Sequence, residues 1–170
     1  MKKLSVPNND NSPDMQRLTN EYGNDLLRMC YLYLHDLQLA EDVVQDTYIK
    51  VYQNWDKFKG KSSEKTWITS IAINACKSHL RRSWYKNLLF SSDINQEPYR
   101  EDKIPDDTVL KEISKLKPKY REIILLFYYQ EMKTKDIAAA LRITESAVTV
   151  RLSRAREQLK KSLKGWYFDE

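Results

Sequence analysis

Apolar residues recur at spacings of three and four through most of the chain, which is the pattern of amphipathic helices. The first stripe begins after Asp14 and consists of Leu18, Tyr22, Leu26 or Leu27, Met29, Cys30, Tyr33 and Leu34. Alternation of the strand type is hard to find, and glycine is scarce, with 3 residues. The pattern predicts an all-α fold.

The next stretch, LQLAEDVVQDTYIKVYQNWDKF, combines an inward stripe with an acidic face. The stripe consists of Val44, Thr47, Tyr48, Val51 and Trp55. Asp42, Gln45 and Asp46 share a separate face. A helix dipole near its N-terminus favours Glu41 and Asp42 without any partner. The complete acidic face also suits a basic protein surface, so both interpretations stay open.

A loop with Gly60 leads into a third predicted helix, TWITSIAINACKSHLRRSWYKNLL. Its expected buried stripe is Ile68, Ile71, Ala72, Ala75, Cys76 and Leu80 (or His79). Lys77, Arg81 and Arg82 lie off this stripe, between Trp67 and Trp84. Cations that follow a backbone and rings that stack on bases suit single-stranded nucleic acid. Core packing is an equally open role for the two tryptophans.

The periodicity stops between residues 86 and 108, where two prolines and six acidic residues predict an acidic, flexible linker. The chain is therefore expected to contain two helical modules, residues 14–85 and 109–164. Residues 1–13 are expected to form a disordered leader and residues 165–170 a C-terminal tail. After the linker, one stripe consists of Val109, Leu110, Ile113 and Leu116. Pro118 can open the next helix, and Ile124, Leu125, Phe127 and Tyr128 are expected to form an apolar floor.

Residues 132–164 read as two helices separated by a tight break. The first presents Ile137, Ala138 and Leu141 inward. The second presents Ala147, Val148, Leu152, Ala155 and Leu159 inward, and Thr144 stands where an N-cap belongs. This pattern predicts a helix-turn-helix, whose second helix enters the DNA major groove. A plain αα-hairpin with a solvated basic face is the alternative, and a left-handed Arg142 in the turn would cost about 1 kcal/mol relative to Gly.

The charge distribution favours a phosphate-binding second module. Residues 110–164 contain 14 Lys and Arg against 6 Asp and Glu, a balance of +8 within a chain total of +5. No apolar run follows the N-terminal lysines or reaches the roughly 20 residues of a membrane span, so we expect a cytoplasmic protein with no membrane contact of its own. The isolated Cys30 and Cys76 suggest reduced thiols. Cys76 and His79 lie one helical turn apart, but two ligands do not complete a metal site, so we expect Cys76 to pack in the core. No cofactor and no enzymatic activity are predicted.

Three stretches in this order resemble the extracytoplasmic-function group of bacterial RNA polymerase sigma factors. AEDVVQDTYIKVYQNWDKF is similar to the polymerase-docking helix of the family, and TWITSIAINACKSHLRR resembles its −10 element helix. LKPKYREIILLFYYQEMKTKDIAAALRITESAVTVRLSRAREQLK resembles its −35 binding domain. The resemblance covers residues 14 to 161.

The resemblance implies an alternative sigma factor that binds core RNA polymerase, melts promoter DNA and directs initiation, of a stress or cell-envelope regulon. A sigma-2-like module would dock on the β′ clamp helices through Asp42, Gln45 and Asp46. The residues that match −10 element positions are Phe58, Lys61, Ser62, Ser63, Glu64, Trp67, Asn74, Lys77, Arg81 and Arg82. A sigma-4-like module would contact the β flap and duplex −35 DNA, and an anti-sigma factor is an expected partner. The corresponding −35 residues are Thr144, Ser146, Thr149, Arg151, Ser153, Arg154 and Arg156.

This chain departs from the family at Ile73, Ser78 and Thr149, where the family often has Arg, Asp, and Arg or Lys. Thr149 cannot form a bidentate contact to guanine, so a different −35 sequence is expected. Two other functions fit parts of the pattern. A stand-alone helix-turn-helix regulator, with a sensing or dimerising first module, would bind duplex DNA tightly without polymerase. An enzyme acting on nucleic acid would need paired carboxylates or a metal cluster, and the sequence offers neither.

Overall fold

The computed structural model describes residues 12–89 and 108–167, with side chains at 12–83 and 108–164. Within these ranges the chain is helical and contains no strand. Most of the predicted leader, most of the predicted linker and the end of the predicted tail lie outside the described residues. The last helix of the first module reaches Leu89, four residues beyond the predicted boundary at residue 85.

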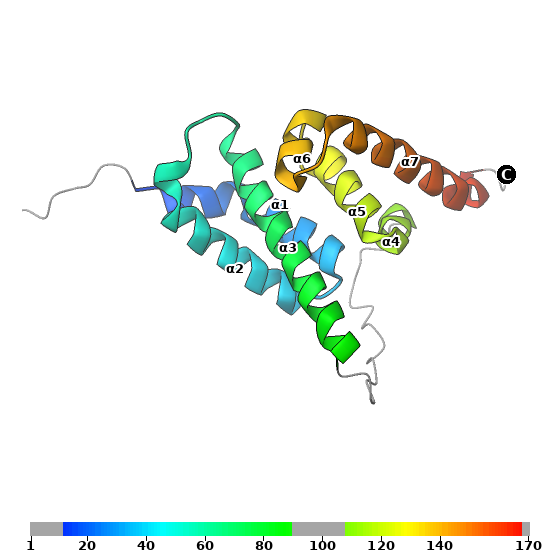
Figure 1. The fold of residues 1–170 in the computed structure, drawn as a ribbon, viewed down its shortest axis with the longest axis horizontal. Helices are drawn as coiled ribbons and strands as arrows, with labels where there is room; N and C mark the ends of the chain where they lie inside the picture. Colours follow the sequence, from blue (N-terminus) through cyan, green and yellow to red (C-terminus); the bar gives the residue numbers. More distant parts are fainter. Residues whose placement is uncertain (1–11, 90–107, 168–170) are drawn as a thin grey trace, which may run out of the picture.

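The first module consists of α1 (Met15–Leu34), α2 (Leu37–Gln53), the short 3-10 turn η1 (Trp55–Lys57) and α3 (Glu64–Leu89). Side chains define where the helices begin: Asp14 accepts a hydrogen bond from the Arg17 N–H at 3.0 Å, and Asp36 accepts one from the Leu39 N–H at 2.9 Å. Between these helices His35 adopts a left-handed conformation, with φ 60°. The helices α2 and α3 both pack on α1 (Figure 1).

The core of this module confirms most of the predicted stripes. Leu18, Cys30 and Ile68 are fully buried. The prediction for α2 was wrong by one residue, since Val43 is fully buried and Val44 is half-buried. With two adjacent valines, only packing decides which one lies at the centre of the helix face.

The second module consists of α4 (Thr108–Lys115), α5 (Pro118–Ile124), the π-turn η2 (Leu125–Tyr129), α6 (Thr134–Leu141) and α7 (Glu145–Tyr167). Pro118 lies in the first turn of α5, as predicted, because the missing N–H of proline is not needed there. In Figure 1, α4 and α5 lie under the long α7, and α6 stands nearest to the first module.

The π-turn changes which residues face the core. The Gln130 N–H donates to the Leu125 carbonyl at 3.0 Å, a bond five residues back that widens the turn. Leu126 is fully buried, whereas Tyr128 is 51% exposed. The expectation that Tyr128 belongs to the apolar floor was therefore wrong, because the wide turn rotates it outward.

The break between α6 and α7 has the geometry of a helix-turn-helix. Arg142 is left-handed, with φ 54° and ψ 47°, and the Ile143 N–H bonds the Ala138 carbonyl at 3.0 Å, which is the Schellman ending usually built on glycine. Thr144 then accepts a hydrogen bond from the Ala147 N–H at 3.1 Å, so the predicted N-cap is confirmed.

The two modules pack against each other: α6 lies against α3 (Figure 1), and η2 contacts α1. Among the described residues, five polar or charged side chains are buried, and four of them lie at this contact: Thr69, Arg121, Glu122 and Gln130. The Arg121 guanidinium, for example, donates to the Tyr33 carbonyl of the first module at 2.6 Å. Such a polar contact resembles the separable interfaces between domains. None of the described helices is long and apolar enough to span a membrane.

Candidate functional site

The acidic face of α2 is open to solvent. Asp42, Gln45 and Asp46 are exposed on the side opposite to the buried Val43 and Val51. Ile49 and Tyr52, to which the sequence pattern gave no role, are 54% and 59% exposed. Because positions 42, 45, 49 and 52 are three or four apart, they form one continuous strip along the helix. The strip is acidic at its N-terminal end and apolar towards its C-terminal end, which suits a protein partner better than it suits nucleic acid.

The loop before α3 contains an aromatic cluster. Phe58 stacks on Trp67, with ring centroids 5.0 Å apart, and Trp55 lies 5.5 Å from Phe58. All three rings are half-buried, so Trp67 packs against neighbours and still has an accessible edge. Gly60 has φ 67°, which lets the loop turn back to α3 without strain.

The loop residues expected to contact the −10 element differ in what they already bind. Lys61 is exposed. Ser63 accepts a hydrogen bond from the Thr66 N–H at 3.1 Å and so caps α3. The Glu64 carboxylate accepts hydrogen bonds from both terminal nitrogens of the Arg17 guanidinium, at 3.0 and 2.9 Å. The loop therefore offers a cation, while its carboxylate is occupied within the module.

Two of the α3 residues that match −10 element positions contact the second module. The Asn74 side-chain amide donates to the Ala140 carbonyl at 2.9 Å, and the Lys77 ammonium lies 3.3 Å from Glu122. Arg81 and Arg82 lie further along the helix, and both are exposed. The side chain of Trp84 lies outside the described residues. The face of α3 that could receive bases is thus partly covered, and its basic end is open.

The corresponding face of α7 is mostly open. Ser146, Thr149, Ser153 and Arg154 are exposed, and so is Thr144 at the cap. Arg151 is the exception, because its guanidinium lies 3.2 Å from the Glu122 carboxylate. These residues face away from the buried Val148, Leu152 and Ala155, which hold α7 on its own module.

Glu122 has no counterpart in the sequence prediction. Its side chain is 3% exposed, and its two oxygens face Lys77 and Arg151. Burial raises the pKa of Glu122, and the two cations oppose that rise. A glutamate directly before the apolar run from Ile123 to Tyr129 was the available signal, since a buried carboxylate needs cationic partners.

Both modules match known protein families. Residues 18–85 match Sigma-70 region 2, and residues 106–159 match Sigma-70, region 4. The RNA polymerase sigma-H factor of Pseudomonas aeruginosa is 30% identical over 164 residues, covering 86% of this chain and 84% of the relative. The chain belongs to the extracytoplasmic-function group of bacterial RNA polymerase sigma factors.

Two further comparisons agree. The ECF RNA polymerase sigma factor SigW of Bacillus subtilis is 28% identical, covering 84% of this chain and 85% of SigW. The sigma factor RpoE from Bartonella quintana, solved in complex with the anti-sigma factor NepR, superposes with a TM-score of 0.73 at 24% identity, covering 92% of this chain and 99% of RpoE. As a sigma factor, the protein binds core RNA polymerase and promoter DNA and directs transcription initiation.

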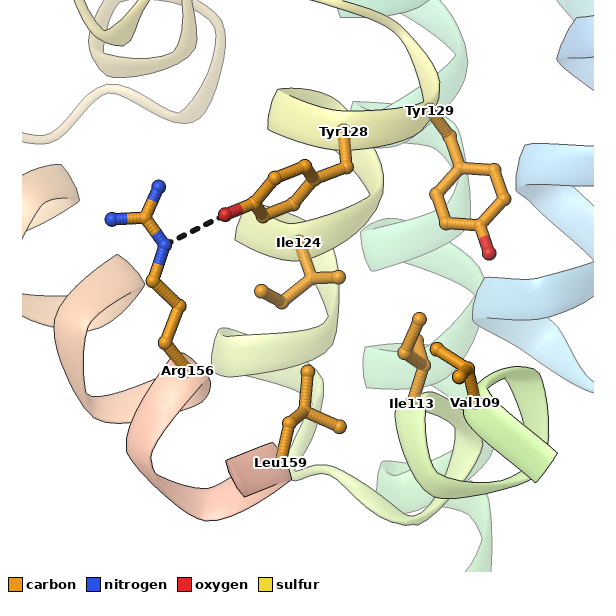
Figure 2. Close-up of a pocket in the computed structure, with 7 residues that line it drawn as sticks. All are labelled: Val109, Ile113, Ile124, Tyr128, Tyr129, Arg156 and Leu159. Atoms are coloured by element: carbon orange, nitrogen blue, oxygen red, sulfur yellow. Dashed lines mark hydrogen bonds between the residues drawn. The ribbon is translucent and has the colours of Figure 1, made fainter. Parts of the chain in front are cut away.

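The second module of this sigma factor also contains an apolar cavity of about 430 Å³, lined from α4, α5, η2 and α7 (Figure 2). Tyr128 lies at the cavity, and its hydroxyl accepts a hydrogen bond from Arg156 at 2.7 Å. The Arg156 guanidinium also lies 5.4 Å from the Phe127 ring centroid. Arg156, which the resemblance matched to DNA, is therefore held at the cavity in this structure.

The described residues contain no group of three or more His, Cys, Asp or Glu side chains that could hold a metal ion. Cys30 and Cys76 are both buried free thiols. A hydrogen bond with the neighbouring Cys30, together with burial, raises the pKa of Cys76. Cys76 therefore stays protonated, and a protonated thiol in a core is unreactive.

Proposed function

We propose that this sigma factor docks on core RNA polymerase through the exposed strip of α2. The observation that carries this proposal is the exposure of Asp42, Gln45 and Asp46 together with Ile49 and Tyr52 on one face. Carboxylates complement a basic partner and guide its approach, while the two apolar side chains supply area that is removed from water on binding. The partner surface that fits is the β′ clamp helices.

The proposal assigns the −10 element to the first module. Flipped bases of the non-template strand would enter beside Phe58, Trp67 and Asn74, with Lys61, Ser62, Ser63 and Glu64 forming the surrounding loop. Lys77, Arg81 and Arg82 would hold phosphates. Stacking and hydrogen bonds in such a pocket offset the few kcal/mol that base extrusion costs.

The −35 element is assigned to α7. Thr149, Ser153 and Arg154 would face base edges, and Thr144 and Ser146 at the helix start would contact the backbone, where the helix dipole favours phosphate. Arg151 and Arg156 would contact phosphates after leaving their present partners, Glu122 and Tyr128.

The apolar cavity of the second module is assigned to the β flap of the polymerase. Its lining combines aliphatic side chains of α4 and α7 with Tyr128 and Tyr129, so it fits an apolar helix or loop (Figure 2). Arg156 at its edge can bond a carbonyl or carboxylate of that segment.

The proposal also includes an anti-sigma protein that covers these polymerase-binding surfaces. The sigma factor would act in the cytoplasm and would catalyse no reaction. The sigma factor RpoE from Bartonella quintana was solved in complex with the anti-sigma factor NepR. The exposed strip of α2 and the apolar cavity are the surfaces that such a regulator would cover to keep polymerase away. A stress or cell-envelope regulon is the proposed target.

Binding to purified bacterial core RNA polymerase tests the docking assignment. Asp42→Ala/Asp46→Ala should weaken binding at least about tenfold, equivalent to about 1.4 kcal/mol. The matched control is Glu21→Ala/Asp56→Ala, which removes two exposed carboxylates from other parts of the same module and should bind like the wild type. Equal binding by both double variants would move the interface away from α2. A wild-type chain that binds no polymerase would contradict the proposal as a whole.

A further inference from the structure

The outward face of α7 has an apolar residue at its centre. Val148, Leu152 and Ala155 are buried and hold the helix on its own module. Successive residues are about 100° apart around a helix, so Val150 lies roughly opposite the middle of this buried stripe. Val150 is 48% exposed, although the sequence pattern gave it no role. The helix itself runs along the outer edge of the second module (Figure 1).

The neighbours of Val150 on this face are polar. Ser146 and Arg154 lie one turn before and one turn after it, and Thr149 and Ser153 lie beside it. All four are exposed. A single exposed valine is ordinary elsewhere on a protein surface. At the centre of a patch that is assigned to base edges, it meets the group that the major groove presents at that point.

The hydroxyl groups at the start of this face are already bonded within the chain. The Thr149 hydroxyl donates to the Glu145 carbonyl at 3.1 Å, and the Thr144 and Ser146 hydroxyls share a hydrogen bond of 3.0 Å. Because its proton is used by the helix backbone, Thr149 offers a base an acceptor and a methyl group but no donor. Val150 adds two methyl groups and no polar atom. The first two turns of α7 therefore offer apolar contact at the centre of their outward face.

One group in the major groove matches such a contact. Thymine presents a methyl group on C5, whereas guanine, adenine and cytosine present hydrogen-bond acceptors and donors there. An apolar side chain that covers an acceptor or a donor leaves it without a hydrogen bond, which costs free energy. Val150 therefore favours thymine and also disfavours the other bases. The branched side chain of valine is stiff, so it loses little rotamer freedom when it is held against a base.

We propose that Val150 is a specificity-determining residue of this sigma factor and contacts the 5-methyl group of a pyrimidine, thymine in unmodified DNA, at one position of the −35 element. The methyl group of the adjacent Thr149 would extend the same apolar surface. The proposal rests on the assignment of α7 to the −35 element. It names the base that α7 selects where Thr149 cannot form a bidentate contact to guanine.

Selection of binding sites, followed by removal of single methyl groups, tests the proposal. Core RNA polymerase carrying the full chain selects duplex fragments that are randomised over the −35 and −10 regions. Each thymine of the selected −35 site is then replaced by deoxyuridine, which lacks only the 5-methyl group. Cytosine and 5-methylcytosine at the same position form a second pair, which separates the effect of the methyl group from that of the rest of thymine.

Three proteins are compared in equilibrium binding: the wild type, Val150→Ser and Leu37→Ala. The last is the matched control, because Leu37 is a 54% exposed aliphatic residue at the start of α2, outside the docking strip. Circular dichroism establishes that the variants keep the helical content of the wild type.

The wild type and Leu37→Ala should bind the uracil site about three- to fivefold more weakly than the thymine site, which is the effect of removing one methyl group from an apolar contact. The site with 5-methylcytosine should bind better than the site with cytosine by a similar factor. In Val150→Ser both ratios should fall close to one. A selection repeated with Val150→Ser should lose the preference for thymine at that position.

Two results would overturn the proposal. One is a selected site in which no replacement of thymine by uracil weakens binding of the wild type. The other is a loss on replacement that Val150→Ser retains in full, since another residue would then contact the methyl group.

Arg154→Ala distinguishes these failures from a failure of the proposed function. If Arg154→Ala changes the selected −35 sequence while Val150→Ser retains the loss on replacement, α7 contacts the −35 element and only the role of Val150 is wrong. If both variants select the wild-type −35 sequence, α7 does not determine it, and both proposals fail. A chain that binds no core polymerase would show separately, in the co-migration assay.

Discussion

The two helices assigned to promoter DNA, α3 and α7, differ in how much of their binding face is accessible. On α3, Asn74 and Lys77 are bonded to the second module. On α7, Thr149, Ser153 and Arg154 are exposed. Two side chains of the helix assigned to single-stranded DNA are thus bonded to the second module, whereas the residues of α7 assigned to base edges have no such contact with the first module.

The difference matches the order in which the two kinds of DNA become available. Duplex DNA is present throughout the chromosome, while a separated −10 strand exists only where a promoter is being opened. Under the proposed assignments, α7 can contact duplex DNA while Asn74 and Lys77 of α3 are still bonded to the second module. The α2 strip, which we propose as the docking surface, is exposed as well, so the proposed docking does not require the modules to separate.

The largest expected effect concerns Arg121, which joins the modules from a buried position. Its guanidinium donates to the carbonyls of Tyr33, Ser114 and Leu116, so Arg121→Ala leaves buried acceptors unbonded and should lower the free energy of unfolding by about 2–4 kcal/mol. Arg28→Ala is the control, since Arg28 is exposed and lies over the Tyr129 ring at 5.6 Å, a contact worth about 0.5–1 kcal/mol. Urea denaturation measures both. Similar losses of unfolding free energy in Arg121→Ala and Arg28→Ala would show that the burial of Arg121 contributes little to stability.

The next effect concerns the open face of α7. Arg154→Ala should weaken binding of a duplex promoter fragment by about 1–3 kcal/mol without changing the affinity for core polymerase. Arg156→Ala should cost less duplex affinity, because Arg156 is held by Tyr128. Filter binding measures the affinity for the duplex, and co-migration measures the affinity for core polymerase. Equal loss of both activities in Arg154→Ala would make Arg154 a structural residue.

A smaller effect is a dependence of stability on pH. Burial, followed by the charge of Arg121, lowers the pKa of His35 to about 4 from its ordinary value of 6.5. The unfolded chain therefore binds the extra proton between these values, and stability should fall as the pH drops from 6.5 to 4, by about 1 kcal/mol after allowance for solvent screening. His35→Asn, which tolerates the left-handed backbone, should show a shallower pH dependence in urea denaturation. Identical pH profiles would exclude His35 as the cause.

The smallest effect concerns the turn before α7. Arg142→Gly should raise the free energy of unfolding by about 0.5–1 kcal/mol, because glycine adopts the left-handed conformation without strain. Arg142→Ala, which removes the charge and keeps the Cβ, should give no such increase. Thermal denaturation of the three proteins decides between strain and charge. An increase for alanine that equals the one for glycine would point to charge.

The sequence predicted the helices and most of the core, because amphipathic spacing, capping residues and Pro118 are local signals. It also placed the acidic residues of α2 and the exposed residues of α7 on open faces. It did not predict the contact between the modules. That contact depends on Glu122, Gln130 and Ile73, which are far from their partners in the sequence and which local patterns treat as ordinary members of a helix. The π-turn that exposes Tyr128 also escaped prediction, because it shifts the periodicity by one residue inside an apolar run.

The most direct test of the difference between open and covered faces is the acetylation rate of individual lysines in the free chain, measured by mass spectrometry. Lys50 on α2 is exposed, whereas Lys77 on α3 pairs with Glu122. We expect Lys77 to react several-fold more slowly than Lys50 in the wild type, and Glu122→Gln to remove most of this difference. Equal rates for the two lysines in the wild type, or a slow Lys77 that Glu122→Gln does not accelerate, would contradict the pairing of Lys77 with Glu122 across the two modules.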